Sequence, residues 1–372
     1  MEANPVLGVF LHAIGGLAAA SFYIPLKRVR GWAWETYWLV LGAVAWMITP
    51  WIVASIQIPD LMEVLRSVPT VVLLRCYFYG ILWGIGGIMY GLTMRYLGIS
   101  LGVAIALGFC AAFGTLTPPI VDGKILDLIS SYSGLATLSG VAICLIGIAI
   151  CGLAGIRKEA ELTEEQKKDS VSEFSFVKGV VVAIVAGVMS ACMAFAIAAG
   201  KPIADAAIEH GAESLWSNLP VFIVAFAGGF TTNLFWCCYL NIRNSTIRDY
   251  VRTSQGSQLS NYLWCALGGV TWYLQFMFYG MGTTRMGRYD FSSWTIHMAF
   301  IIIFGTLWGL WLREWRGVRP ATANLVWAGI AILILSTVVV GWGTYLSIEP
   351  VQALETSKAY FSKGSLQQLA LF

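Results

Sequence analysis

The segment WGIGGIMYGLTMRYLGISLGV, which runs from Trp83 to Val103, sets the architecture that the rest of the chain follows. It carries one helix out of an apolar span, reaches a basic residue at Arg95, and begins a second apolar span within a few residues. A glycine-rich and aromatic sequence of this kind allows close helix packing inside a membrane. The segment therefore predicts two membrane spans joined by a tight turn at Arg95.

A related segment, WYLQFMFYGMGTTRMGRYDFSSW, occupies residues 272–294 of the second half. Trp83 matches Trp272, and Tyr90-Gly91 matches Tyr279-Gly280, both at an offset of 189 residues (83 to 272). Phe113-Gly114-Thr115-Leu116 matches Phe304-Gly305-Thr306-Leu307 at an offset of 191 (113 to 304). Because the matches keep their order and nearly their register, they indicate an internal duplication. Duplicated halves in a membrane chain are typical of transporters.

The composition is that of a membrane protein. Hydrophobic residues make up 58% of the chain, charged residues 12%, and the mean hydropathy is +0.73, so polar groups are too few to cover a soluble surface. A net charge of +3 spread between the spans gives no reason to expect a nucleic-acid partner, whereas membrane lipid is expected. The eight cysteines lie in apolar stretches without a CxxC pair and predict neither a metal site nor a cofactor.

Ten stretches have the length of about 20 residues that a bilayer requires. They are Val6–Leu26 and residues 36–57, 71–93, 97–119, 133–155, 176–200, 216–240, 260–282, 292–312 and 322–346. No basic residue precedes the first stretch, which argues against a signal peptide. The expected fold is an all-α membrane protein with ten transmembrane helices.

One long charged segment, RKEAELTEEQKKDSVSEFS at residues 157–175, falls after the fifth span. It divides the chain into a first five-helix repeat (1–156), a cytoplasmic linker (157–175), a second five-helix repeat (176–346) and a C-terminal tail (347–372). Since each repeat has an odd number of spans, the second enters the membrane in the opposite sense. That arrangement is the inverted repeat of alternating-access transporters.

The basic residues predict the orientation of the chain. Fifteen Lys and Arg residues fall in the odd-numbered connections and eight on the other side, so the fifteen are placed in the cytoplasm by the positive-inside rule. Both termini are therefore expected outside the cytoplasm, which means the periplasm for a bacterial inner membrane.

Four segments resemble the L-rhamnose/proton symporter family, a branch of the ten-helix drug/metabolite transporter superfamily. They are GVFLHAIGGLAAASFYIPLKRVRGWAWETYW (Gly8–Trp38), LWGIGGIMYGLTMRYLGISLG (Leu82–Gly102), KPI (Lys201–Ile203) and WYLQFMFYGMGTTRMGRYDFSSWTIHM (Trp272–Met298). The resemblance implies a transporter that imports L-rhamnose or a related 6-deoxy sugar with a proton as coupling ion. Gly87 and Met89 stand where members often carry asparagine, and Thr283-Thr284 where a His-Ala pair is common, which leaves the exact sugar open.

The candidate sugar site lies on one helix face. Trp272, Gln275 and Tyr279 are spaced i, i+3, i+7, and Trp83 and Tyr90 repeat that face in the first half. An indole can stack on the apolar face of a sugar, and amide and phenol groups can pair with its hydroxyls. Each aromatic residue can equally be a packing or interfacial residue, but a mid-span amide such as Gln275 requires a partner.

Titratable residues within the spans are candidates for proton coupling, because charge is costly in hydrocarbon. Asp290 is the first choice, His297 is its runner-up or relay partner, and Glu35 is a third candidate. His297 suits proton coupling because an imidazole exchanges protons near neutral pH. His12 and His297 are also candidate sugar ligands. The alternatives are a packing role for His297 and helix capping for Glu35 and Asp290.

Arg95 and Arg285 occupy equivalent turns of the two repeats and are candidate gate or salt-bridge residues. The alternative is that both anchor the topology, as basic residues at span ends commonly do.

Two other function classes are considered beside the sugar importer. An exporter or exchanger of a metabolite, drug or nucleotide sugar could use the same scaffold. A membrane-embedded enzyme would need a catalytic motif, and the sequence holds neither HExxH nor GxSxG. The chain is therefore not expected to be an enzyme.

Overall fold

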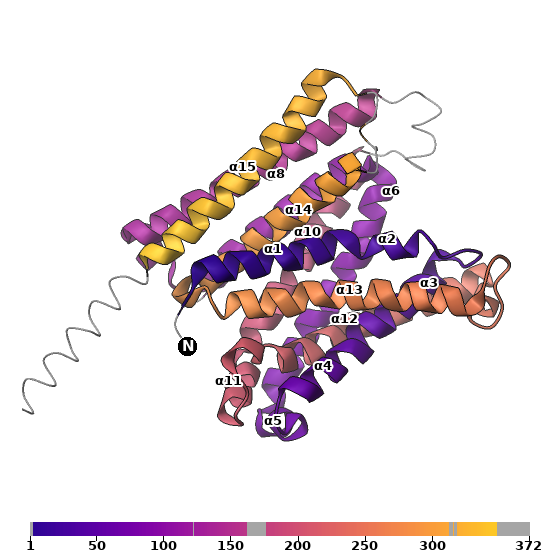
Figure 1. The fold of residues 1–372 in the computed structure, drawn as a ribbon, viewed down its shortest axis with the longest axis horizontal. Helices are drawn as coiled ribbons and strands as arrows, with labels where there is room; N and C mark the ends of the chain where they lie inside the picture. The colour runs from indigo at the N-terminus through magenta and orange to yellow at the C-terminus, as the bar shows by residue number, and fades with distance from the viewer. Residues whose placement is uncertain (1–2, 122, 162–175, 312–314, 316–317, 348–372) are drawn as a thin grey trace, which may run out of the picture.

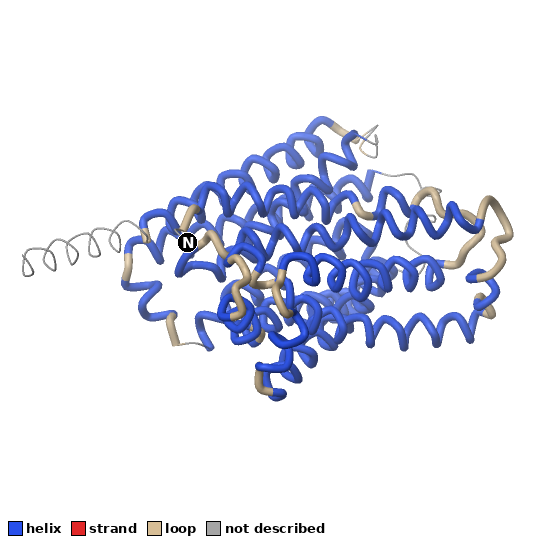
Figure 2. The backbone as a smooth tube through the Cα atoms, turned by 60° about the horizontal axis from the view of Figure 1, so that its bottom comes forward, coloured by secondary structure: helices blue, strands red, loops and turns tan. Residues whose placement is uncertain are grey.

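The computed structural model describes residues 3–121, 123–161, 176–311, 315 and 318–347, and within these residues the chain is helical and contains no strand (Figures 1 and 2). The α-helices are α1 Pro5–Ser21, α2 Tyr23–Leu26, α3 Trp34–Gly42, α4 Thr49–Gln57, α5 Leu61–Ser67, α6 Thr70–Val121, α7 Ile125–Ser130, α8 Tyr132–Glu161, α10 Phe176–Ala199, α11 Lys201–Glu209, α12 Leu219–Asn244, α13 Gln258–Thr283, α14 Ser293–Trp311 and α15 Pro320–Leu346. A π-helix, η1, joins α3 to α4 over Ala43–Ile48, and short 3-10 helices occupy Ser214–Trp216, Ile247–Tyr250 and Gly287–Ser292.

Eight helical segments of the described chain are long and apolar enough to cross a membrane. They are Pro5–Leu26, Trp34–Gln57, Thr70–Tyr90, Tyr132–Lys158, Val177–Glu209, Ser214–Asn244, Asp290–Trp311 and Pro320–Leu346. Ile105–Val121 is apolar but shorter, and α13, which includes Gln258, Ser260, Asn261 and Gln275, is not among the eight. The chain is a multi-pass membrane protein, and the count of ten spans stays a prediction.

The predicted turn at Arg95 takes the form of a bend, because the residues on both sides of Arg95 are assigned to one helix, α6. No proline interrupts α6 before Pro118, so no residue in this region breaks the helix on account of a missing amide. The helix nevertheless folds back. Gly86 in its first half approaches Ser190 of α10, and Ala106 in its second half approaches Gly187, within one turn of Ser190. Twenty residues of straight helix would span about 30 Å, so α6 bends sharply between Gly86 and Ala106.

Helix α1 packs closely between α13 and α14 because it presents glycines to both. A Cβ atom on Gly15 would lie 2.8 Å from the Gln275 carbonyl oxygen and 3.2 Å from the His297 ring. A Cβ atom on Gly16 would collide with Phe300 of α14. These glycines therefore set the short distance between α1 and the helices that carry several candidate site residues.

Helices α8 and α15 run antiparallel along one edge of the molecule (Figure 1). Gly140 and Gly147 of α8 face Val340 and Leu333 of α15. Gly329 and Gly343 of α15 in turn face Cys151 and Thr137 of α8, so that small residues alternate between the two helices.

The first residues of the predicted linker, 157–161, belong to α8, which continues as a helix to Glu161. Residues 157–161 are Arg-Lys-Glu-Ala-Glu, which are good helix formers, and the Glu161 carboxylate accepts hydrogen bonds from the Arg319 amide and the Thr322 hydroxyl at the start of α15. Residues 162–175 and the tail from 348 to 372 lie outside the described residues.

Candidate functional site

Three of the predicted site residues meet in the interior. His12 of α1, Tyr279 of α13 and His297 of α14 have ring centroids 5.3 Å (His12 to Tyr279), 5.2 Å (Tyr279 to His297) and 6.2 Å (His12 to His297) apart. Both histidines are completely buried and Tyr279 is 4% exposed. We call these three residues the histidine cluster. It joins His12 to two residues that lie 267 and 285 positions later in the sequence (12 to 279 and 12 to 297).

Glycine spacing makes this meeting possible. Gly282, one turn after Tyr279 on α13, lies so close to α1 that a Cβ atom there would be 2.8 Å from the His12 ring. Gly15 serves the same purpose beside His297. A side chain at either glycine would push the helices apart or displace an imidazole, so the cluster depends on both positions.

The nitrogen atoms of the histidine cluster have no hydrogen-bond partners within the described part of the chain. This is true of Nδ1 and Nε2 in both His12 and His297. Most buried polar atoms in native proteins are paired, and leaving one unpaired costs about 1–3 kcal/mol. Ring nitrogens left without partners here would be costly for folding, which makes the histidine cluster a candidate site for a polar ligand.

An aromatic cluster lies beside the histidines. Trp83 of α6 and Trp272 of α13, the equivalent residues of the proposed repeat, have ring centroids 5.8 Å apart. Phe226 of α12 and Phe276 of α13 complete the packing around Trp272 at 5.5 Å and 5.2 Å. Phe276 also lies 6.1 Å from Tyr279 and 6.3 Å from His297, and it therefore connects the two clusters.

Trp46 is a member of the aromatic cluster that the sequence analysis missed. Its ring lies 5.9 Å from Trp83 and 5.4 Å from Trp272, it is 3% exposed, and its Nε1–H has no partner among the described residues. The residue sits in the π-helix η1, where the Thr49 amide donates to the Val44 carbonyl five residues back. Pro50 lacks the amide that would bond to the Trp46 carbonyl in an α-helix, and this proline was the available sequence signal.

Gln275 and Tyr90 join the site less completely. Gln275 is 7% exposed and its amide makes no hydrogen bond with a described residue, so it shares the unpaired character of the histidines. Tyr90 is half-buried on α6 and makes no ring contact with a described aromatic residue. The structure brings His12, Tyr279 and His297 together, and Trp83 with Trp272, but it does not place Tyr90 against either group.

Glu35 lies in a different, hydrogen-bonded setting at the start of α3. Its Oε1 accepts from Asn244 Nδ2 at 3.0 Å and from the Thr246 hydroxyl at 2.9 Å, at the end of α12. Nearby, the Ala33 amide donates to Asp249 Oδ2 at 2.8 Å. We call these residues the loop network, because they fasten the connection before α3 to the connection after α12. This geometry favours a structural role for Glu35, and its coupling role stays a prediction.

Asp290 and Arg285 flank the turn between α13 and α14. Asp290 is exposed in the 3-10 helix Gly287–Ser292, directly before α14, which carries His297. The Arg285 carbonyl accepts from the Asn4 amide at 3.0 Å, and its Cβ lies close to Gly8. This main-chain contact joins the turn before α14 to the start of the first helix, and the gate role of Arg285 stays a prediction. The side chain of Arg95 lies outside the described residues.

The fold and the site together define a class. A multi-pass helical membrane protein with unpaired imidazole, indole and amide groups in its interior has the features of a transporter with a polar substrate. Within the described residues, no group of three or more His, Cys, Asp or Glu could hold a metal ion.

Comparison with known proteins gives the family. Residues 1–345 match the family model of the L-rhamnose-proton symport protein. The chain is 40% identical over 340 residues to the L-rhamnose-proton symporter of Cronobacter sakazakii, covering 91% of this chain and 97% of the relative. It is 38% identical to the symporters of Klebsiella pneumoniae strain 342 and Yersinia pestis strain Pestoides F, covering 91% of this chain and 97% and 98% of the relatives. The chain belongs to the L-rhamnose-proton symport protein family, a family of transporters and not of enzymes.

Proposed function

We propose that this protein imports L-rhamnose or a closely related 6-deoxy sugar together with protons. The observation that carries the proposal is the match along nearly the whole chain to relatives named for that activity. The unpaired interior groups can form hydrogen bonds with the hydroxyls of such a substrate, and the aromatic cluster supplies an apolar wall.

The two clusters divide the recognition of the sugar between them. Sugar hydroxyls would pair with the imidazoles of His12 and His297, the Tyr279 hydroxyl and the Gln275 amide. These groups are buried or nearly so, and a buried polar group needs a hydrogen-bond partner. Trp83 and Trp272 would stack against the apolar face of the ring and its methyl group, with Trp46 closing the wall. Binding would then satisfy ring nitrogens that have no partner among the described residues.

Proton coupling is proposed to use Asp290 and His297. Asp290 is exposed at the start of the span that carries His297, and seven residues of helix rise about 10 Å. Asp290 could take a proton from the outside and His297 could carry it beside the sugar, where the nearby His12 ring would compete for it. Glu35 is the remaining candidate.

The two halves are proposed to be inverted five-helix repeats, within a total of ten spans, that work by alternating access. Equivalent contacts support this arrangement. Gly80 packs on Ala225, and Gly269, 189 residues later (80 to 269), packs on Val44. Helices α8 and α15, the last of each half, run antiparallel, as equivalent helices of an inverted pair must.

A second pair of contacts supports the same arrangement. Gly16 packs on Phe300 and Gly187 packs on Phe109, and the two phenylalanines are separated by 191 residues (109 to 300), which is also the offset of the repeated Phe-Gly-Thr-Leu segments.

The proposed location is the bacterial inner membrane, with both termini in the periplasm. The excess of basic residues in the odd-numbered connections supports it. So do contacts between connections assigned to one side: Asn4 bonds to Arg285, Arg30 bonds to Asn261, and Glu161 bonds to Arg319.

Transport into cells tests the proposal directly. Adding L-rhamnose to lightly buffered, energy-depleted cells that express the protein should raise the pH of the medium, because protons enter with the sugar. Asp290→Asn should lose this alkalinisation and keep sugar binding, and a normal proton response in that variant would refute the assignment of Asp290. If labelled sugar leaves preloaded cells against its gradient and no uptake occurs, an exporter or exchanger is the better description.

A further inference from the structure

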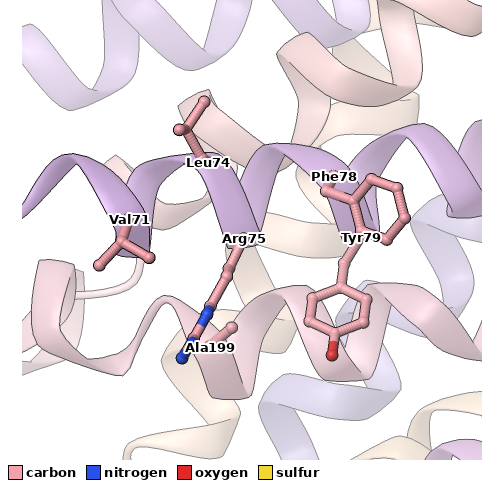
Figure 3. A pocket seen from close by; sticks show the side chains of 6 residues that line it. All are labelled: Val71, Leu74, Arg75, Phe78, Tyr79 and Ala199. Atoms are coloured by element: carbon pink, nitrogen blue, oxygen red, sulfur yellow. The ribbon is translucent and has the colours of Figure 1, made fainter.

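A hollow of about 380 Å³ opens between α6 and α10, on the opposite side of α6 from its contacts with α12. Its lining residues come from the first turns of α6 and the last residue of α10: Val71, Leu74, Arg75, Phe78, Tyr79 and Ala199 (Figure 3). None of them belongs to the histidine or aromatic cluster, so the hollow is separate from the proposed sugar site.

Arg75 is the one charged residue that lines this hollow. It lies five residues after the start of α6, or about 7.5 Å along the helix, and is therefore near one end of the candidate span Thr70–Tyr90. Its guanidinium points toward Ala199 on α10, and the Tyr79 hydroxyl projects on the same side (Figure 3). Arg75 is exposed and makes neither an ion pair nor a hydrogen bond with any residue that the structure describes. The guanidinium donors are therefore available to an anion.

The residues beside Arg75 are suited to hydrocarbon. Val71 is 53% exposed, Leu74 60% and Phe78 55%, and all three lie in a segment apolar enough to span a membrane. Tyr79 packs its ring against Phe195 of α10 at 5.9 Å, which fixes the position of its hydroxyl. A cation and a hydroxyl beside an exposed apolar surface match the two parts of a phospholipid.

We propose that this hollow is a binding site for an anionic phospholipid. Arg75 holds the phosphate in the bidentate manner typical of guanidinium groups, Tyr79 donates a hydrogen bond to the headgroup, and the acyl chains lie along Val71, Leu74 and Phe78. The lining supplies one cation and no carboxylate, so an ammonium-bearing headgroup would find no partner for its positive charge. The site therefore selects a headgroup with net negative charge, such as phosphatidylglycerol. This inference does not depend on which sugar is transported.

The test measures lipid binding to the purified full-length protein in detergent. Phosphatidylglycerol, phosphatidylcholine with the same acyl chains, and inorganic phosphate are titrated separately while thermal unfolding is followed. Phosphatidylglycerol should raise Tm more than phosphatidylcholine, because a ligand of the native state stabilises it. Arg75→Gln should weaken phosphatidylglycerol binding about tenfold or more. Arg66→Gln, which changes an exposed arginine on the neighbouring helix α5, is the matched control and should bind normally.

Three outcomes would overturn the inference. Equal stabilisation by both phospholipids would indicate apolar contact alone, and stabilisation by inorganic phosphate alone would indicate a simple anion site. Unchanged phosphatidylglycerol binding by Arg75→Gln would remove Arg75 from the site. Should Arg75→Gln fail to purify, Tyr79→Phe keeps the ring contact with Phe195 and removes only the hydroxyl. It should weaken binding by a smaller factor, and wild-type affinity in this variant would also contradict the proposal.

Discussion

The histidine cluster and the Glu35 carboxylate of the loop network are both buried and polar, but they differ in hydrogen bonding. In the loop network, the Glu35 carboxylate accepts two hydrogen bonds and Asp249 accepts from the Ala33 amide. In the histidine cluster, four ring nitrogens find no partner among the described residues. Burial alone therefore does not separate a functional polar residue from a structural one, whereas the pairing of its polar atoms does.

This difference has an energetic meaning. A paired buried group stabilises the fold, and removing it leaves its partners unpaired. An unpaired buried group opposes folding and persists where function requires it. Substitutions in the two regions should therefore change stability and transport in opposite ways.

The largest expected effect is at His297. His297→Leu replaces an imidazole that has two unpaired nitrogens with an apolar side chain. We expect uptake of L-rhamnose to fall by more than about a hundredfold, while Tm stays equal or rises because no buried polar atom is left unpaired. Uptake and thermal unfolding are measured on the same preparations. A large loss of Tm would show that His297 is structural and would remove the contrast between the two regions.

Gln275→Ala should have the next largest effect. The amide is nearly buried and has no partner among the described residues, so its loss should weaken sugar binding by about 1–3 kcal/mol, or about five- to 150-fold, with little change in Tm. Calorimetric titration of the purified protein checks this. Thr271→Ala, at a half-buried position of the same helix whose hydroxyl donates to the Leu267 carbonyl, is the control, and equal sugar affinity in both variants would contradict the prediction.

Glu35→Gln should show the opposite pattern. The Gln amide oxygen can accept both hydrogen bonds that Glu35 Oε1 receives, but a neutral acceptor makes them weaker, so we expect a loss of about 1–2 kcal/mol in stability and unchanged sugar affinity. Thermal unfolding and calorimetry measure the two quantities. If coupling to protons disappears in this variant while Tm is unchanged, Glu35 belongs with the transport residues after all.

The smallest effect is expected at Glu161, outside the spans. Hydrogen bonds from the Thr322 hydroxyl and then the Arg319 amide lower the pKa of its carboxyl group. The carboxylate therefore stabilises the fold above the ordinary carboxyl pKa of about 4.3, and this contribution is lost as the pH falls through the lowered pKa. Glu161→Gln should reduce Tm slightly at pH 7, and the difference from the wild type should disappear at low pH. A difference that grows toward low pH would be incompatible with this explanation.

The helical fold was predictable because apolar stretches of span length dominate the sequence. Each expected stretch is helical in the described chain, and only the joint at Arg95 differs, since helix continues there through a bend that tertiary contacts impose. The site was predictable in part. Helical spacing placed Trp272, Gln275 and Tyr279 on one face, but the approach of His12 to His297 depends on how α1 packs against α14.

The periodicity of the sequence could not predict two other features, the place of Trp46 and the hydrogen-bond partners of Glu35. Trp46 enters the aromatic cluster through a π-helix, which shifts the register that a pattern of 3.6 residues assumes. Glu35 was ranked by its charge, whereas its partners Asn244 and Thr246 lie about 210 residues away and no spacing rule connects them.

The antiparallel pair formed by α8 and α15 restricts how the two halves can move. Each helix presents two glycines directly to the other helix, at regular intervals along the line of contact. These glycines are Gly140, Gly147, Gly329 and Gly343. Sliding by one residue would bring a side chain against a position that has room only for hydrogen. We therefore expect this pair to resist translation along its axis, and in the proposed alternating-access cycle it would serve as a pivot between the two halves.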